Sequence, residues 1–264
     1  MSLAVVILAA GKGTRMKSAL PKVLHEVAGK AMVQHVVDAA TSLAADNTII
    51  VYGHGGDQVK HTVNGDHLQW AEQAEQLGTG HAVAQAMPLV KEDIVLVLYG
   101  DVPLIRPETL RDFVDSVDDK TLALMTLTLD DPSGYGRIVR DGQNNVQRIV
   151  EQKDASEAEL GIPEINTGIL ACTRSFLDDC LPKLSSNNAQ GEYYLTDVIA
   201  IDDLFHLIPA VAVDDDGVVG GQAGGGIHHM LDHGFAGHFM QHLGQRTFHA
   251  GAFAGGENDD CNRP

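Results

Sequence analysis

Basic residues are scarce in this chain of 264 residues. It contains 18 lysines and arginines against 36 aspartates and glutamates, which gives a formal net charge of -18 at pH 7. So much negative charge repels nucleic acid and anionic membranes, and we expect neither as a partner. Any anionic ligand must therefore be met by a few positive groups gathered at one place.

Cysteines and long apolar runs are also lacking. The three cysteines, Cys172, Cys180 and Cys261, do not have the spacing of metal ligands or redox pairs, which favours free thiols in a reducing compartment. No apolar run approaches the roughly 20 residues that a helix needs to span a bilayer, and the first residues lack the basic flank and cleavage site of a signal peptide. We therefore expect a cytoplasmic protein.

Up to about residue 204 the chain alternates between two apolar patterns. Runs of strand length are separated by stretches with helical spacing, which predicts an α/β fold with helices on both faces of a mostly parallel sheet. Several runs end in Gly or Asp, and ligands of open α/β sheets bind beyond the carboxyl ends of the strands, so we expect the site there. The predicted strands are 5–8, 49–52, 94–99, 122–129 and 168–171, the predicted helices are 33–45, 81–90, 107–117 and 175–184, and a β-hairpin is expected between 134 and 153.

The first predicted strand is followed by a glycine-rich loop, GKGTRM, at residues 11–16. A dinucleotide fingerprint requires a third glycine where Met16 stands, and a P-loop requires Gly-Lys-Ser/Thr after four spacer residues, so neither motif fits. What remains is a turn whose backbone N–H groups can approach an anion closely, with Arg15 and Lys22 supplying positive charge beside it. Glycines alone would indicate only a turn, but Arg15, Pro21 and Lys22 favour a polyphosphate.

Two further positions have a functional and an ordinary interpretation. Asp101 follows the most hydrophobic run of the chain, and a carboxylate there suits Mg²⁺, which takes one or two carboxylates plus phosphate oxygens and waters. Asp101 would equally suit a cap of the turn that follows. Gln73 precedes the glycines at 78 and 80 and can hydrogen-bond the edge of a base, although the segment would also suit an ordinary helix start.

Several strings, taken together, resemble one enzyme family. LAAGKGTRM alone indicates only the wide superfamily of nucleotidyl and sugar-nucleotide transferases, whereas AEQLGTGHA, EINTGI and NNAQGEYYLTD are much narrower. In this order, across residues 4 to about 200, they resemble the uridyltransferase half of bacterial bifunctional N-acetylglucosamine-1-phosphate uridyltransferase/glucosamine-1-phosphate acetyltransferases. The resemblance implies a Rossmann-like nucleotidyltransferase fold and an Mg²⁺-dependent reaction of UTP with N-acetylglucosamine 1-phosphate, which yields UDP-N-acetylglucosamine and pyrophosphate.

The resemblance also implies a role for each matching residue. Arg15 and Lys22 bind phosphate and stabilise the transition state, and Asp101 ligates Mg²⁺. The nucleotide is bound by Leu8, Ala9, Ala10, Gly11, Gly13 and Lys22, with Gln73, Gly78 and Thr79 at the uracil, and the ribose and sugar are bound by Tyr99, Gly100, Asp101, Gly136, Glu151, Asn166, Tyr194 and Thr196.

Two features of that family have no counterpart in this chain. One is the segment with the asparagine that supplies a second protein ligand for Mg²⁺, and the other is the set of hexapeptide repeats that forms the acetyltransferase half. We therefore expect the uridyltransferase activity alone, with one carboxylate and the substrate phosphates holding the metal. Because the family trimerises through the repeats, we expect a monomer.

The last sixty residues follow a different rule. If residues whose numbers add up to 265 are paired, every pair from Ala4 with Cys261 to Lys60 with Phe205 is compatible with reverse-complementary codons. Our interpretation is that 205–264 is an antisense translation of residues 4–60, attached to a nucleotidyltransferase domain at 1–204, and we expect it to be poorly ordered. Its many histidines then derive from valine and methionine codons rather than from a metal site. The rival interpretation is that 207–214 is a native strand.

Overall fold

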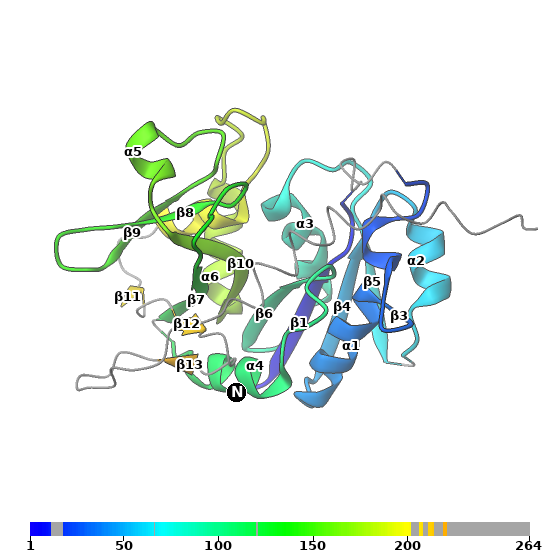
Figure 1. Cartoon of the computed structure of the whole chain (residues 1–264). Helices are drawn as coiled ribbons and strands as arrows, with labels where there is room; N and C mark the ends of the chain where they lie inside the picture. Colours follow the sequence, from blue (N-terminus) through cyan, green and yellow to red (C-terminus); the bar gives the residue numbers. More distant parts are fainter. Residues whose placement is uncertain are drawn as a thin grey trace, which may run out of the picture.

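The computed structural model describes residues 1–11, 18–65, 67–119 and 121–201, together with the backbone of 206–207, 211–213 and 219–220. A central sheet with strand order β13-β12-β7-β10-β6-β1-β4-β5 is flanked by helices on both faces (Figure 1). Its strands are β1 (Leu3–Leu8), β4 (Asn47–Tyr52), β5 (Leu68–Glu72), β6 (Ile94–Tyr99), β7 (Thr121–Thr128), β10 (Glu164–Thr173), β11 (His206–Leu207), β12 (Val211–Val213) and β13 (Val219–Gly220). The helices are α1 (Met32–Ser42), α2 (Gly56–Thr62), α3 (Thr79–Ala86), α4 (Pro107–Asp115), α5 (Glu157–Leu160) and α6 (Arg174–Cys180), with 3-10 turns η2 (Lys22–Leu24), η3 (Met87–Leu89), η4 (Leu181–Lys183) and η5 (Leu195–Ala200).

The strand pairing brings the ends of four strands to one edge. β1 pairs in parallel with both β4 and β6, and β4 pairs in parallel with β5. β10 runs antiparallel between β6 and β7. The carboxyl ends of β1, β4, β5 and β6 therefore meet at the edge opposite the N-terminus, which lies at the bottom of Figure 1.

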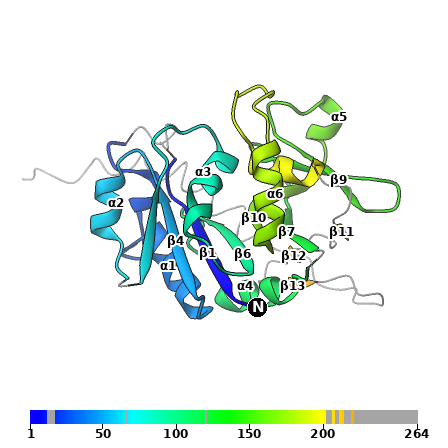
Figure 2. The same cartoon turned by 180° about the vertical axis from the view of Figure 1, so that it is seen from behind.

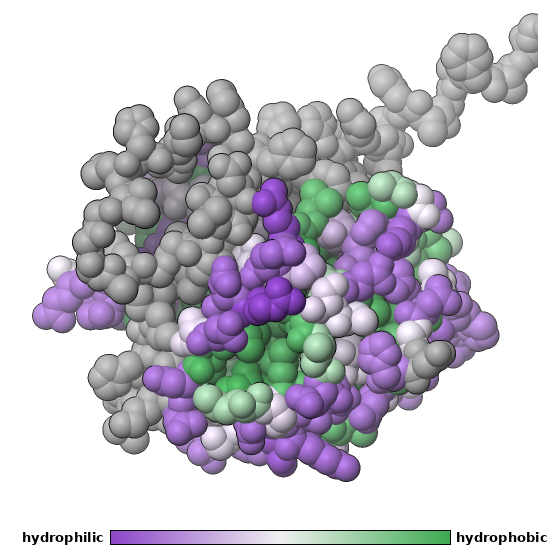
Figure 3. All heavy atoms as spheres, turned by 90° about the horizontal axis from the view of Figure 1, so that it is seen from below, coloured by the Kyte–Doolittle hydropathy of each residue, from purple (hydrophilic) through white to green (hydrophobic). Residues whose placement is uncertain are grey.

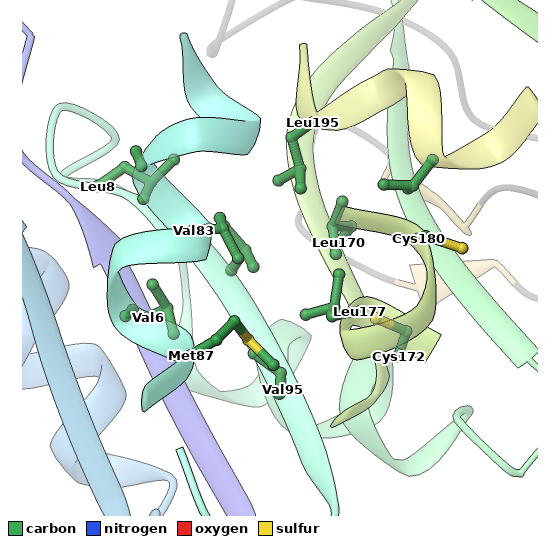
Figure 4. Close-up of a cluster of buried hydrophobic side chains, with 14 of the residues drawn as sticks. Val6, Leu8, Val83, Met87, Val95, Leu170, Cys172, Leu177, Cys180 and Leu195 are labelled. Carbon is green, nitrogen blue, oxygen red and sulfur yellow. The ribbon is translucent and has the colours of Figure 1, made fainter. Parts of the chain in front are cut away.

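Alternation along the strands builds two separate hydrophobic cores. Because successive side chains of a strand point to opposite faces, Val6 and Leu8 of β1 pack with α3, α6 and η5, as Figure 4 shows. Val5 and Ile7 pack on the other face with α1 and α4. All four are at most 8% exposed. Figure 2 views the molecule from the side that α3 and α6 cover. The sheet is thus buried on both faces, as an α/β fold requires.

The predicted hairpin is present beside this sheet. β8 (Arg137–Arg140) pairs antiparallel with β9 (Val146–Val150), and β8 joins β10 through Arg137 and Ile165. The Asp141 carboxylate closes the turn by accepting from the N–H groups of Gln143 and Asn145, each at 2.9 Å. Arg137 is only 1% exposed and donates to the Tyr135 carbonyl and the Gln152 side chain, which fixes the base of the hairpin.

The predicted α/β fold is therefore confirmed, with differences at the ends of elements. The helices predicted at 81–90 and 175–184 give way to 3-10 turns that contain Pro88 and Pro182, because proline has no N–H to continue an α-helix. β10 extends well beyond the predicted 168–171. The strand β5, the helices α2 and α5, and the short pair β2 (Glu26–Val27) and β3 (Lys30–Ala31) were not predicted.

Three short strands lie within the segment predicted to be an antisense tail. β11 and β12 pair in parallel with β7, and β13 pairs antiparallel with β12. The remainder of 205–264 lies outside the described residues. These pairings do not test the antisense origin, which concerns the gene and stays a prediction.

The opposite edge of the sheet, where β1 and β6 begin, holds none of the predicted site. Seen from that side, hydrophilic residues surround a hydrophobic area (Figure 3). A cavity of about 570 Å³ there is lined by Met1, Asp93, Thr173 and other mostly charged residues. None of the predicted site residues lines it. Among the helices of the described residues, none is long and apolar enough to cross a membrane.

Candidate nucleotide and sugar site

The ends of β1, β4 and β6 are in direct backbone contact at the upper edge of the sheet. The Ala9 N–H donates to the Val51 carbonyl at 2.8 Å, and the Gly100 N–H donates to the Leu8 carbonyl at 2.9 Å. Ala9 and Ala10 are buried, and Gly11 is exposed at the point where the chain leaves the sheet. Four of the residues predicted to bind the nucleotide, 8–11, thus lie at the predicted edge.

A cation and a carboxylate meet at this edge. Lys22 begins η2, and its Nζ lies 2.5 Å from Oδ2 of Asp101, which lies in the turn after β6. Their side chains are 37% and 21% exposed, so both groups remain accessible. The predicted partners Gly13 and Arg15 lie outside the described residues.

Gln73 lies just beyond β5 with only 3% of its surface exposed. Its Nε2 donates to the Gly78 carbonyl at 3.0 Å and contacts Nδ1 of His81 at 3.1 Å. Gly78 has φ of 114°, in the region that favours glycine, and precedes the first residue of α3. The unusual backbone of Gly78 therefore directs its carbonyl at Gln73.

A distant stretch of chain pairs with the start of α3. The Tyr193 N–H donates to the Leu77 carbonyl, and the Gly80 N–H donates to the Tyr193 carbonyl, both at 2.8 Å. The hydroxyl of Thr79 accepts from the Leu195 N–H at 2.9 Å. The two predicted residues on this return segment, Tyr194 and Thr196, are each 8% exposed.

Three other predicted residues meet between the hairpin and β10. The Asn166 N–H donates to the Gly136 carbonyl at 2.8 Å, and a Cβ on Gly136 would lie 3.0 Å from the carboxylate of Glu151. Burial raises the pKa of Glu151, and the negative charges of Asp154, Asp197 and Glu192 raise it further. The site thus has a strongly acidic side.

Tyr99 connects the two groups of residues. A Cβ on Gly168 of β10 would lie 2.5 Å from its ring. Burial raises the pKa of Tyr99 far above its ordinary value, the charges of Glu151 and Asp101 add to the rise, and the polar side chain of Thr79 lowers the pKa slightly. The structure therefore brings the described residues predicted for nucleotide and sugar to one region around Tyr99.

Comparison with known proteins identifies the domain. Residues 5–140 match the sequence model of the MobA-like NTP transferase domain. The chain belongs to this family. Over 201 residues, it is 85% identical to the bifunctional protein GlmU of Alcanivorax borkumensis. This alignment covers 76% of this chain and 44% of that protein. Over 223 residues it is 56% identical to GlmU of Chromohalobacter salexigens, covering 83% and 49% respectively. The chain spans about half the length of the curated relatives it matches.

Solved structures share the fold of this NTP transferase domain. A UDP-glucose pyrophosphorylase complexed with UDP-glucose superposes with a TM-score of 0.60 at 16% identity, covering 75% of this chain and 86% of the other. HddC from Yersinia pseudotuberculosis superposes with a TM-score of 0.53 at 21% identity, covering 73% and 83%. At these identities the likeness concerns the fold alone, and it agrees with the predicted nucleotidyltransferase architecture.

Two residues of the NTP transferase domain adjoin the site although no role was predicted for them. The pKa of Tyr135 is raised by burial and then by the negative charge of Asp101. His81 contacts Gln73. His81 lies two residues after the predicted Thr79, and Tyr135 directly precedes the predicted Gly136, both in strings that carry the family resemblance. This closeness to predicted residues was the signal that the sequence offered.

Proposed function

We propose that this domain transfers the uridylyl group of UTP to N-acetylglucosamine 1-phosphate, giving UDP-N-acetylglucosamine and pyrophosphate. The observation that carries the proposal is the contact between Lys22 and Asp101 at the edge where β1 and β6 end. It provides a movable positive charge and an oxygen ligand within one hydrogen bond of each other. Identity of 85% to a GlmU over 201 residues supports this choice of substrates.

The reaction needs no basic side chain to activate the attacking group. A phosphate monoester with a second pKa of about 6 is largely a dianion at pH 7. Its oxygen attacks the α-phosphorus of UTP, a new P–O bond forms, and the bond to the bridging oxygen of the leaving pyrophosphate breaks. The protein's task is to align these groups and to neutralise the charge that accumulates on them. Lys22, together with Arg15, is proposed to supply this positive charge.

The chemistry of Asp101 fits a magnesium ion. Its carboxylate is partly exposed, and Mg²⁺ prefers oxygen ligands, usually one or two carboxylates with phosphate oxygens and waters. Within the described part of the chain no group of three or more His, Cys, Asp or Glu is arranged to hold a metal, so substrate phosphates would have to complete the shell. A bound Mg²⁺ would neutralise phosphate charge. Lys22 would then leave Asp101 and bind phosphate.

The two sides of the site are proposed to hold the two substrates. Gln73, Gly78 and Thr79 lie on the side of α3 and suit a base, because they offer polar groups beside a glycine that permits close approach. Glu151 and Asn166 lie on the hairpin side and offer acceptors and an amide to sugar hydroxyls. Residues of both sides, Thr79 and Glu151, influence the pKa of Tyr99.

The direct test measures pyrophosphate released by the full chain from UTP and N-acetylglucosamine 1-phosphate with Mg²⁺. Release that requires both substrates supports the proposal. Calorimetric binding of UTP without release would instead indicate a nucleotide-binding domain without turnover, which is the alternative function. Faster release with another sugar 1-phosphate or another nucleotide would overturn the choice of substrates. Sedimentation of the same sample tests the proposed monomer.

A further inference from the structure

The side-chain amide of Gln73 has its orientation fixed by its neighbours. Nε2 lies 3.0 Å from the Gly78 carbonyl, which can only accept a hydrogen bond, so the nitrogen must point there. The second N–H of the amide points to Nδ1 of His81 at 3.1 Å. With both N–H groups occupied, the amide carbonyl Oε1 is left for another partner.

His81 lies where its ring can accept from Gln73 through Nδ1. Its other ring nitrogen, Nε2, lies 3.2 Å from Nε2 of Gln85, one turn further along α3, and that Gln85 nitrogen also donates to the His81 carbonyl at 3.4 Å. A chain of three side chains, Gln85, His81 and Gln73, thus runs from the helix to the site.

Within the described residues, Oε1 of Gln73 has no hydrogen-bond partner. The side-chain hydrogen bonds of Gln73 are made by Nε2. Among the described residues, Oε1 is not one of the fully buried side-chain oxygens and nitrogens that lack a partner. The backbone of Gln73 lies against the end of β4, where a Cβ on Gly53 would be 3.0 Å from the Gln73 carbonyl and 3.1 Å from Cβ of Ala10. Gln73 therefore lies at the edge where the nucleotide is proposed to bind.

We propose that His81 is a positioning residue that sets the base specificity of this domain by holding Oε1 of Gln73 outward as an acceptor. Uracil carries a proton on N3 and can donate to that oxygen. The N3 atom of cytosine carries no proton and is itself an acceptor. It would face Oε1 of Gln73 without a hydrogen bond between them. The inference deepens the proposed function and rests on it, because it assumes that a uridine nucleotide binds beside Gln73.

The test compares His81→Leu, which removes the acceptor, with His81→Asn, whose Oδ1 can accept near the position of Nδ1. Pyrophosphate release is measured with UTP and with CTP, and calorimetry gives the affinity of each nucleotide. We expect His81→Leu to lower the UTP/CTP ratio of kcat/KM about tenfold, chiefly through KM for UTP, because one mismatched polar contact is worth about that factor. His81→Asn should restore most of the ratio.

The control is His61→Leu, which alters an exposed helix histidine whose Nδ1 contacts a backbone carbonyl at 2.6 Å. It should leave the ratio unchanged. An unchanged ratio in folded His81→Leu, or equal losses in His81→Leu and His81→Asn, would overturn the inference. If the unaltered chain releases no pyrophosphate, the proposed activity fails while the calorimetric UTP/CTP ratios still decide the role of His81.

Discussion

Lys22 and Asp101 are separated by 79 residues and still form an ion pair. Each was predicted as a site residue from its own surroundings, one beside a glycine-rich loop and the other after a hydrophobic strand. Their contact depends on the parallel pairing of β1 with β6, which no local pattern specifies. The Asp101 carboxylate bonds to the Lys22 ammonium group, and its two interpretations, as a metal ligand and as a turn cap, stay predictions.

Lys22→Ala is expected to lower kcat by about 10² to 10³, because it removes charge that acts on the transition state. The affinity for UTP should fall less. Initial rates of pyrophosphate release and calorimetric titration with UTP measure the two effects. Lys30→Ala is the matched control. Lys30 lies away from the site, and its Nζ forms an exposed ion pair with Oδ2 of Asp38 at 2.6 Å. A uniform loss in both variants would contradict the role of Lys22.

Glu151→Gln is expected to stabilise the fold at neutral pH. The pKa of Glu151 is raised by burial and then by three neighbouring carboxylates, so the folded state binds its proton more tightly than the unfolded state does. Stability therefore falls as the pH rises from the ordinary carboxyl pKa to the raised value, and the amide removes this loss. Each 1 kcal/mol corresponds to about 2–4 °C in Tm.

Thermal unfolding at pH 4 and pH 7 checks this sign. The gain from Glu151→Gln should appear at pH 7 and shrink toward pH 4. Glu159→Gln should do the opposite, because hydrogen bonds from Ser156 and the charge of Arg148 lower the pKa of Glu159. Stability from Glu159 is present above the ordinary carboxyl pKa and is lost as the pH falls through its lowered value. Destabilisation by Glu151→Gln at pH 7 would refute the argument.

At the scale of elements, the start of α3 depends on a single glycine. A Cβ on Gly78 would lie 2.5 and 2.7 Å from the backbone oxygen and nitrogen of Tyr193, and its φ of 114° strains any other residue. Gly78→Ala is therefore expected to cost about 1–3 kcal/mol and to weaken UTP binding. Urea unfolding and calorimetry measure the two losses.

Gly142→Ala provides the matched control. Gly142 lies in the turn between β8 and β9, and a Cβ there would have no atom within 4 Å. The positive φ of this turn belongs to Asn144 instead. Gly142→Ala should leave both stability and UTP affinity unchanged. Equal effects of the two substitutions would show that the contact with Tyr193 is unimportant.

The sequence predicted elements with a strong apolar period and missed those without one. β1, β6 and β7 are long buried runs, and the amphipathic helix α4 begins with a proline at its first residue. β5 alternates only weakly because it lies at the edge of the sheet, and α5 has just four residues. The capping box of Ser156 and Glu159 was the available signal for α5.

The site was predicted residue by residue but not as an arrangement. Family strings indicated Thr79 and Tyr194 separately, whereas the pairing of their segments is a contact across more than a hundred residues. The link from Gln73 to His81 was likewise invisible, because hydrogen bonds of side chains depend on how a loop meets a helix. The roles of Gly13 and Arg15 stay predictions, since both lie outside the described residues.

At the scale of the whole molecule, the antisense interpretation makes a sharp prediction about the gene. The codons of 4–60 and 205–261 should be reverse complements at all three positions, including third positions that the amino acids leave undetermined. Sequencing single molecules of source DNA across the junction measures this. Third positions that differ at random, or an uninterrupted native locus, would overturn the interpretation.

The return of the chain at 193–195 sets an order for biosynthesis. Leu77 and Gly80 obtain their backbone partners only when Tyr193 has been made, long after the first strands have left the ribosome. A nascent chain arrested before that point lacks the return segment that pairs with the start of α3. The backbone partners of Leu77 and Gly80 are therefore supplied late in translation.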